Sequence, residues 1–309
     1  MNNTVIILLG PTGVGKTGVS LILAKTLHTE IISADSMLLY RNMDIATAKP
    51  TEEELKSVPH HLINILEPHQ SFSAGKFREM ALTVIEELQK KNKIPLIVGG
   101  TGLYIRTLTQ GLFAGPQADW NFRQELLDQE QHKGEGYLYK RLMEIDPQAA
   151  QTIHPSDQRR IVRALEIRIK ADKNLTEIHL ETRPAPFEFI KIGLMRDRKE
   201  LYQIIDTRVD TMIKQGLIEE TEKLLSMKVS DTAMQALGYK EINRFLHQEC
   251  TLDEAVTMLK TRTRNYAKRQ LTWFKKEPHI QWVDITGLYD SHKIFHKILN
   301  DVEIVARMI

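Results

Sequence analysis

Cysteine is almost absent from this sequence of 309 residues, in which Cys250 stands alone. A single cysteine excludes an internal disulfide framework and a cysteine-rich zinc module, and it fits a reducing cytoplasm. Long apolar runs are also missing, since no stretch approaches the ~20 residues that a membrane-spanning helix needs. The apolar run near the N-terminus is too short for a signal peptide, and no basic segment precedes it. We therefore expect a cytoplasmic protein without a membrane segment.

An excess of charge is missing as well, because the formal net charge is only +2. Any surface that binds nucleic acid must therefore come from local clusters of basic residues. Hydrophobic residues make up 42% of the chain, which is enough for the core of one large domain or two smaller ones. Internal repeats and low-complexity tracts are lacking. A monomer is the default expectation.

A glycine-rich stretch directly follows the first apolar run, VIILL at residues 5–9, which is typical of a buried strand. It matches the G-x-x-x-x-G-K-[ST] pattern of a phosphate-binding loop and precedes a segment with helical spacing. The residues are Gly10, Pro11, Thr12, Gly13, Val14, Gly15, Lys16 and Thr17. The loop amides and the helix N-terminus attract a polyanion, Lys16 adds a full charge, and the Thr17 hydroxyl suits Mg²⁺ or a phosphate oxygen. The alternative is a tight strand–helix turn with an incidental lysine.

Strands and helices alternate along the chain, which predicts an α/β fold with a parallel sheet. From about residue 116 to 184 the sequence is polar and helical in pattern, with no clear strand. We predict a P-loop NTPase-like α/β core from residues 1–115 and 185–309, and an all-helical insertion domain at 116–184. Further strands are expected at 30–34, 94–98, 189–195 and 280–283, and helices at 18–27, 73–91, 198–215, 217–227, 239–248 and 253–276.

Polar residues follow the predicted strand ends and are expected to converge with the phosphate loop on one cleft. Asp35 fits three roles, namely a magnesium-holding carboxylate, a general base and the N-cap of a helix beginning near Ser36. The turn at residues 99–101 either contacts an anion, presents Thr101 as a hydrogen-bond donor, or is purely structural. Arg208, in the helix expected at 198–215, either reaches this cleft or belongs to surface charge pairs.

Two clusters of basic residues favour a polyanionic partner. The first, at residues 261–276, suits phosphates and unstacked bases, but it is also compatible with an amphipathic helix whose aromatic residues face the core. Its aromatic residues are Tyr266, Trp273 and Phe274. The second cluster lies in the insertion and comprises Arg159, Arg160, Arg163 and Arg168. Arg159 and Arg163 are four residues apart and therefore share a helix face.

Six stretches, in this order, resemble one family: GPTGVGKT, ADSMLLYRNMDIATAKP, VGGTGLY, DQRRIVRALE, QALGYKE and RTRNYAKRQLTWF. They are similar to the bacterial tRNA dimethylallyltransferases, which are isopentenyltransferases that modify tRNA. The resemblance covers nearly the whole chain, from Gly10 to Phe274. The phosphate loop by itself is generic, whereas the other stretches together are specific.

The resemblance implies transfer of a dimethylallyl group from dimethylallyl diphosphate to N6 of the adenosine just 3′ of the anticodon, giving N6-dimethylallyladenosine. The phosphate loop would then hold the diphosphate leaving group with Mg²⁺ at Thr17, and not ATP. Lys16 and the loop amides would stabilise the charge that develops on the leaving group, and Arg208 would assist. Asp35 would accept the N6 proton, and Thr101 would contact the target nucleotide.

The resemblance also implies contacts with the anticodon stem-loop of tRNA, which the helical insertion would clamp. The matching residues are Asp35, Ser36, Met37, Leu38, Thr101, Arg123, Arg159, Arg160, Ile161, Val162 and Arg163. Leu38 stands where the family often has glutamine, so a side-chain hydrogen bond to the base is not expected there. No Cys₂His₂ extension follows the last stretch, so zinc is not expected.

Two other classes of protein fit the phosphate loop. An ATP-dependent P-loop small-molecule kinase would share the sheet, the loop and a carboxylate at a strand end. A non-catalytic RNA-binding or RNA-stimulated ATPase module would need a hydrophobic strand ending in Asp-Glu, whereas the third strand ends at Val98, Gly99 and Gly100.

Overall fold

Six parallel strands form one sheet in the computed structural model, which describes residues 3–112, 116, 119–171 and 183–309. The spatial order of the strands is β3-β2-β4-β1-β5-β6, and all pairs are parallel. The strands are β1 (Thr4–Leu9), β2 (Ile31–Ser33), β3 (His60–His61), β4 (Leu96–Gly99), β5 (Glu188–Met195) and β6 (Ile280–Asp284). The predicted P-loop NTPase-like α/β class is confirmed.

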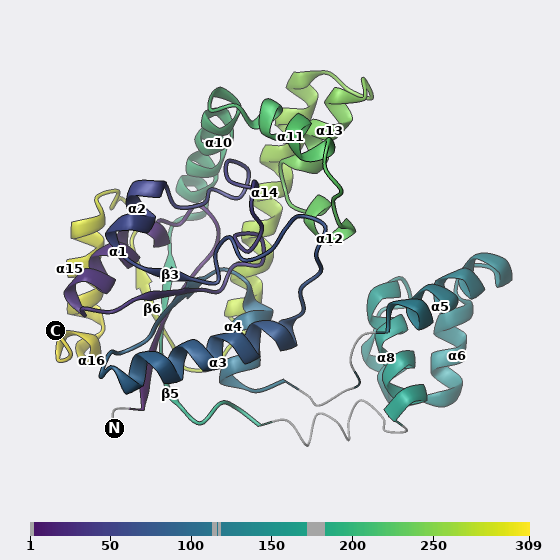
Figure 1. The fold of residues 1–309 in the computed structure, drawn as a ribbon, viewed down its shortest axis with the longest axis horizontal. Helices are drawn as coiled ribbons and strands as arrows, with labels where there is room; N and C mark the ends of the chain where they lie inside the picture. The colour runs from purple at the N-terminus through teal and green to yellow at the C-terminus, as the bar shows by residue number, and fades with distance from the viewer. Residues whose placement is uncertain (1–2, 113–115, 117–118, 172–182) are drawn as a thin grey trace. The chain divides into compact units, whose positions relative to one another are not determined.

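The centre of the sheet is buried on both faces, which explains the continuous apolar runs of its strands. Along β1, Ile6 and Leu8 point into one core cluster, whereas Val5, Ile7 and Leu9 point into the other. The first cluster includes α1 (Lys16–Thr26), α15 (Ser291–Asp301) and α16 (Glu303–Ala306), and the second includes α3 (Ala74–Lys90) and α4 (Gly102–Thr109) (Figure 1). The fold is therefore a three-layer helix–sheet–helix sandwich.

A third core cluster lies among helices that follow β5. It buries Tyr40 and Met43 of the segment after β2 against Val209, Leu217 and Tyr239. The helices of this region are α10 (Arg198–Lys214), α11 (Leu217–Leu225), α12 (Asp231–Met234), α13 (Tyr239–Leu246) and α14 (Leu252–Phe274). The short helix α2 (Glu52–Ser57) lies between β2 and β3 in the chain and has no buried residue. The segment after β2 thus packs on helices that come much later in the chain.

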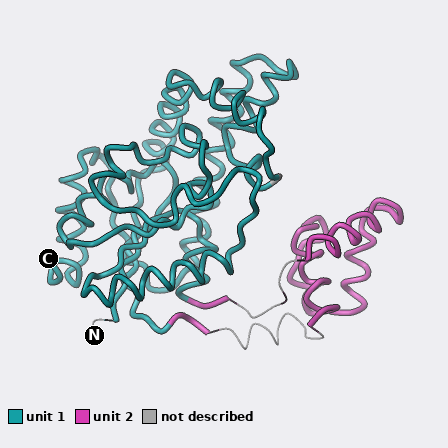
Figure 2. Tube along the Cα trace, viewed as in Figure 1, with its two compact units in different colours: residues 1–109, 186–309 teal, residues 110–185 magenta. Residues whose placement is uncertain are grey.

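The chain divides into two compact units (Figure 2). The first unit comprises Met1–Thr109 and Pro186–Ile309 and contains the sheet; the second comprises Gln110–Ala185. The second unit has its own core, to which Leu126, Leu142 and Leu165 contribute. Its helices are α5 (Trp120–Lys133), α6 (Tyr137–Ile145), α7 (Pro147–Thr152) and α8 (Gln158–Ala171). Within the described ranges of the chain, no helix is long and apolar enough to span a bilayer.

Candidate active site

The phosphate loop connects the carboxyl end of β1 to the N-terminus of α1. Gly15 is the N-cap of α1 with φ 108°, a left-handed conformation that favours glycine. Gly10 is required by close packing, because a Cβ there would lie 2.8 Å from the carbonyl oxygen of Leu194 in β5. No side chain caps α1, so its first amide N–H groups are available to an anion.

Lys16 lies against the loop that precedes it. Its Nζ donates hydrogen bonds to the carbonyl oxygens of Gly10 (2.8 Å) and Pro11 (2.9 Å). Burial lowers the pKa of Lys16 to about 8; the negative charge of Asp35 opposes this shift, and the positive charge of Arg208 adds to it. Lys16 therefore lies close enough to Asp35 and Arg208 for both of their charges to affect its pKa.

Arg208 reaches the phosphate loop from α10. Its Nη1 donates to the Thr12 hydroxyl oxygen at 3.3 Å. Burial lowers the pKa of Arg208, and the charge of Asp35 counteracts this. The charge pairs that were the alternative for Arg208 are also present, but they are formed by other residues of α10. Asp206 pairs with Arg264 (2.6 Å), and Asp210 pairs with Lys260 (2.6 Å). These pairs fasten α10 to α14.

Asp35 follows the carboxyl end of β2, but no helix begins at Ser36, because residues 34–50 form turns, bends and irregular backbone. The N-cap alternative for Asp35 is therefore wrong. Asp35 Oδ1 accepts a hydrogen bond from the Met37 amide at 2.9 Å, which stabilises a local turn. This hydrogen bond holds the Asp35 carboxylate against the turn that follows it.

Thr101 joins the turn after β4 to the turn after β2. Its hydroxyl oxygen accepts a hydrogen bond from the Ser36 amide (3.0 Å), and its own amide donates to the Ala34 carbonyl (3.1 Å). A Cβ at Gly99 would lie 2.2 Å from that carbonyl oxygen, so the approach requires glycine. The turn at 99–101 is therefore structural, and it also brings Thr101 beside Ser36. The loop, Asp35 and Thr101 share the carboxyl edge of the sheet, as predicted.

Two tyrosines, the buried Tyr104 and the partly buried Tyr266, lie near Asp35. Tyr104 stacks on Phe77 with the ring centroids 4.1 Å apart. Burial raises the pKa of Tyr104, with smaller contributions from Tyr40 and Asp35, and it raises the pKa of Tyr266, where Asp35 contributes further. Both phenols stay protonated at neutral pH and give the site aromatic surfaces with neutral polar tips.

The most basic stretch forms the second half of α14. Ala267, Gln270 and Phe274 are buried, Tyr266 and Trp273 are partly buried, and the lysines are exposed. This is the arrangement of an amphipathic helix with a basic outer face. Sequence reasoning missed Gln270, which bridges the phosphate loop and the turn before Thr101. The signal was a polar residue three places after Ala267 and four before Phe274, on the apolar face of the helix.

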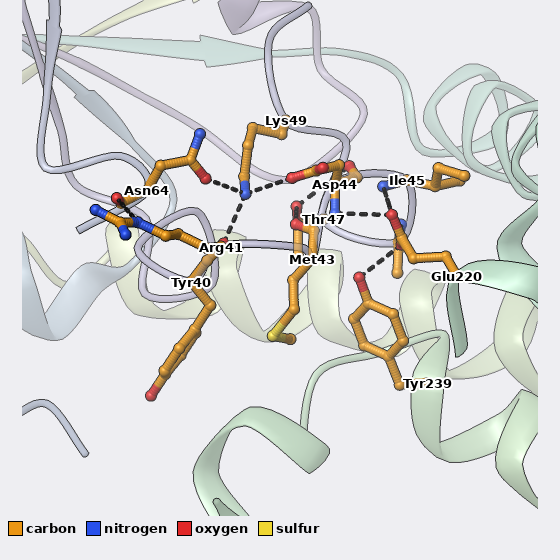
Figure 3. A network of polar contacts seen from close by, with 11 residues as sticks. Tyr40, Arg41, Met43, Asp44, Ile45, Thr47, Lys49, Asn64, Glu220 and Tyr239 are labelled. Carbon is orange, nitrogen blue, oxygen red and sulfur yellow. Dashed lines mark hydrogen bonds and ion pairs between the residues drawn. The ribbon is translucent and has the colours of Figure 1, made fainter. Parts of the chain in front are cut away.

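Lys49 fastens the segment that follows the Asp35 turn (Figure 3). Its Nζ donates to the Tyr40 carbonyl (2.6 Å) and to side-chain oxygens of Asp44 (2.5 Å) and Asn64 (2.5 Å). Burial lowers the pKa of Lys49, and hydrogen bonding to Asp44 opposes this. The side chain is only 4% exposed, so its buried ammonium group connects these three acceptors inside the protein.

Glu220 in α11 binds the same segment from the other side (Figure 3). Its carboxylate accepts hydrogen bonds from the amides of Asp44 (3.0 Å), Ile45 (2.9 Å) and Ala46 (3.2 Å), and from the Tyr239 hydroxyl (2.7 Å). Burial raises the pKa of Tyr239, and the charge of Glu220 adds to it, so the phenol keeps its proton. This contact holds the chain after Leu38 on α11 and α13.

Few ligands for a metal ion are present at the site. In the described ranges, no group of three or more His, Cys, Asp or Glu side chains is arranged to hold a metal. Thr17 lies in the first turn of α1 and is exposed. A single hydroxyl is not enough to bind Mg²⁺ by itself. It fits a Mg²⁺ ion that takes most of its oxygen ligands from a bound diphosphate and from water.

The predicted tRNA-contacting residues of the second unit differ in exposure. Arg159 and Arg160 are exposed at the start of α8, whereas Ile161 and Val162 are 3% and 5% exposed and pack in the core of the unit. The side chains of Ile161 and Val162 are therefore not at the surface of the unit, and contact of the stretch 159–163 with tRNA stays a prediction.

Arg123 and Arg163 both bind the buried carboxylate of Glu166. Burial favours the neutral form of Glu166, but hydrogen bonds from Arg123, the Asp119 amide and Arg163 outweigh it and lower its pKa. This ionised cluster joins α5 to α8, which gives Arg123 and Arg163 a structural role. Whether they also contact RNA stays a prediction.

Comparisons with known proteins identify the family. Residues 38–277 match the IPP transferase family. The chain belongs to the IPP transferase family. It is 51% identical to the tRNA dimethylallyltransferase of Thermodesulfovibrio yellowstonii, over 96% of this chain and 97% of that protein. It is 46% identical to the tRNA dimethylallyltransferase of Alkaliphilus metalliredigens, over 98% of each.

Solved structures of IPP transferases share the fold. The tRNA isopentenylpyrophosphate transferase of Bacillus halodurans is 40% identical, with a TM-score of 0.71 over 99% of both chains. A eukaryotic dimethylallyltransferase, described as acting on tRNA, is 30% identical, with a TM-score of 0.83 over 99% of this chain and 78% of that one. The family resemblance predicted from the sequence is confirmed: the chain is a prenyl-transferring enzyme, and the small-molecule kinase is not supported.

Proposed function

We propose that this IPP transferase moves a dimethylallyl group from dimethylallyl diphosphate to N6 of the adenosine 3′ of the tRNA anticodon, releasing diphosphate. The observation that carries the proposal is the meeting of Lys16, Arg208 and Asp35 at the carboxyl edge of the sheet. Cations beside a phosphate loop suit a diphosphate leaving group, and a carboxylate beside them suits proton removal. The relatives named as tRNA dimethylallyltransferases support this substrate pair.

The phosphate loop would bind the diphosphate through residues 10–17. As the allylic C–O bond breaks, negative charge accumulates on the diphosphate, and Lys16, Arg208 and the first amides of α1 stabilise it. Thr17 would hold Mg²⁺ on the same diphosphate, and the ion would supply further positive charge there. The loop would thus stabilise the departing diphosphate.

Asp35 would act as the general base. The N6 amine attacks the allylic carbon, a C–N bond forms as the C–O bond breaks, and the N6 proton passes to the Asp35 carboxylate. Thr101 and the turn at Ser36, Met37 and Leu38 would hold the target nucleotide. The adenine must leave its stack, which costs a few kcal/mol and least in a single-stranded loop. The aromatic ring of Tyr266, which is partly exposed, suits a flipped base.

The second unit would contact the anticodon stem through phosphates, with Arg159 and Arg160 as the exposed cations and Arg123 and Arg163 beside them. Such a substrate is met in the cytoplasm, where we propose that the enzyme acts as a monomer.

The function is tested by incubating the enzyme with tRNA and either radiolabelled dimethylallyl diphosphate or γ-labelled ATP. We expect label from dimethylallyl diphosphate in N6-dimethylallyladenosine after digestion to nucleosides, and none from ATP. An unlabelled tRNA after incubation with dimethylallyl diphosphate contradicts the proposal, as does transfer of the ATP γ-phosphate. A tRNA with guanosine at the target position is the control and should accept no label.

A further inference from the structure

Gln270 occupies an unusual position for a polar side chain. It lies on the buried face of α14 and is only 6% exposed. Its Oε1 accepts a hydrogen bond from the Thr12 amide in the phosphate loop (2.9 Å), and its Nε2 donates to the Gly100 carbonyl in the turn after β4 (2.9 Å). One carboxamide therefore joins two segments that meet at the carboxyl edge of the sheet.

Both segments carry groups of the proposed active site. Thr12 also accepts the hydrogen bond from Arg208, and Gly100 immediately precedes Thr101. The contact is close, because a Cβ at Gly100 would lie 2.4 Å from Gln270 Nε2. Since the Thr12 amide donates to Gln270, it belongs to the internal structure of the loop rather than to the set that faces a ligand.

We propose that Gln270 is a positioning residue for prenyl transfer. It sets the separation between the loop that holds the leaving group and the turn that carries Thr101 and, through Ser36, the Asp35 carboxylate. The inference rests on the proposed function, in which donor and acceptor sit on these two segments. Reacting atoms must be aligned at about 3 to 3.5 Å, and a misplacement of ~1 Å can cost ~100-fold in rate.

A carboxamide suits this position because it has one acceptor and one donor end. An ionised glutamate could accept from the Thr12 amide but would repel the Gly100 carbonyl. A protonated glutamate restores both hydrogen bonds, since its carbonyl accepts and its O–H donates. Methionine has a similar shape and restores neither bond. These substitutions separate the hydrogen bonds from the packing.

The test measures kcat and KM for transfer from dimethylallyl diphosphate to tRNA in wild-type enzyme, Gln270→Met and Gln270→Glu between pH 5.5 and 8.5. For Gln270→Met we expect kcat to fall ~10- to 100-fold at every pH relative to wild type, with KM for tRNA within about twofold. For Gln270→Glu we expect the same loss at high pH and a recovery of at least about fivefold, relative to wild type, as pH falls and the buried carboxyl takes up a proton. Thr272→Ala, an exposed change on the same helix, should leave kcat unchanged.

Two outcomes overturn the proposal: wild-type kcat in Gln270→Met, or a Gln270→Glu to wild-type ratio that does not rise at low pH. If Gln270→Met fails to fold, as seen by thermal melting, the pH series of Gln270→Glu still decides. Hydrogen exchange at the Thr12 amide gives a readout without catalysis, and its protection should drop in Gln270→Met. A wild-type enzyme that labels no tRNA would refute the proposed function, while the exchange measurement would still test the contact.

Discussion

Asp35 combines a structural hydrogen bond with a proposed chemical role, and two substitutions separate them. Asp35→Asn keeps the oxygen that accepts from the Met37 amide but removes the basic carboxylate, whereas Asp35→Ala removes both. We expect each variant to lose ~100-fold or more in kcat, and only Asp35→Ala to lose about 0.5 to 1.5 kcal/mol in the free energy of unfolding. Single-turnover transfer and urea unfolding provide the two measurements. Wild-type turnover in Asp35→Asn would remove Asp35 from the mechanism.

Lys16 gives a second prediction at the residue scale. Because burial brings the pKa of Lys16 to about 8, the free enzyme loses this positive charge as pH rises through 8. The ratio kcat/KM for dimethylallyl diphosphate, which reports ionisations of the free enzyme, should therefore decline above about pH 8. In Lys16→Arg the guanidinium stays charged, so the decline should disappear even if the rate is lower. An unchanged decline in Lys16→Arg would assign it to another group.

How far single residues are predictable from the sequence depends on where their partners lie. Residues 10–17 are predictable because the whole phosphate loop is one continuous stretch between a strand and a helix. Asp35 and Arg208 are predictable only as candidates, because the contact that places Arg208 comes from Thr12 in another element. Gln270 is recognisable in the sequence only as a polar residue on the apolar face of its helix, and its two contacts are not predictable, since both partners are backbone atoms brought to α14 by the tertiary fold.

At the scale of elements, the central strands are predictable from the sequence, because both of their faces are buried and their residues form continuous apolar runs. The strand predicted at 189–195 forms as β5 from Glu188 to Met195, and the helix predicted at 73–91 forms as α3 from Ala74 to Lys90. The two-residue strand β3, His60–His61, has no apolar run and gives no such signal. The segment 34–50 resembles the start of a helix in sequence but forms turns. Its amides at residues 44–46 donate hydrogen bonds to the side-chain carboxylate of Glu220 in α11.

The contact of Glu220 with this segment supplies the element-scale prediction. Glu220→Gln weakens charge-assisted bonds to three amides and the Tyr239 hydroxyl, so we expect a loss of about 1.5 to 3 kcal/mol in the free energy of unfolding. It should also raise KM for tRNA, because the segment continues from the turn at Asp35 to Leu38. Glu222→Gln, an exposed change on the same helix, is the control and should stay within about 0.5 kcal/mol. Equal unfolding curves for the two variants would show that the contact contributes no stability.

At the scale of the whole molecule, a net charge of +2 means that affinity for RNA must come from particular exposed cations. In the second unit, the ion cluster at Glu166 engages Arg123 and Arg163. Arg160 is exposed and pairs with Asp157 at 3.3 Å, an exposed pair that costs little to exchange for a phosphate. The sequence pattern does not show which residues of the stretch 159–163 are buried, and in the structure Arg159 and Arg160 are its exposed side chains.

This distribution of charge predicts how salt acts on the complex with tRNA. Each phosphate contact releases counterions, so the logarithm of the binding constant should fall linearly with the logarithm of salt concentration. Replacing Arg160 with alanine should flatten that slope by about 0.7 to 0.9, the value for one contact, and leave the thermal melting temperature unchanged. Arg307→Ala removes a similarly exposed arginine, paired with Glu303 near the end of the chain, and should leave the slope as it is. Filter binding at several salt concentrations measures both, and an unaltered slope in Arg160→Ala would exclude a phosphate contact there.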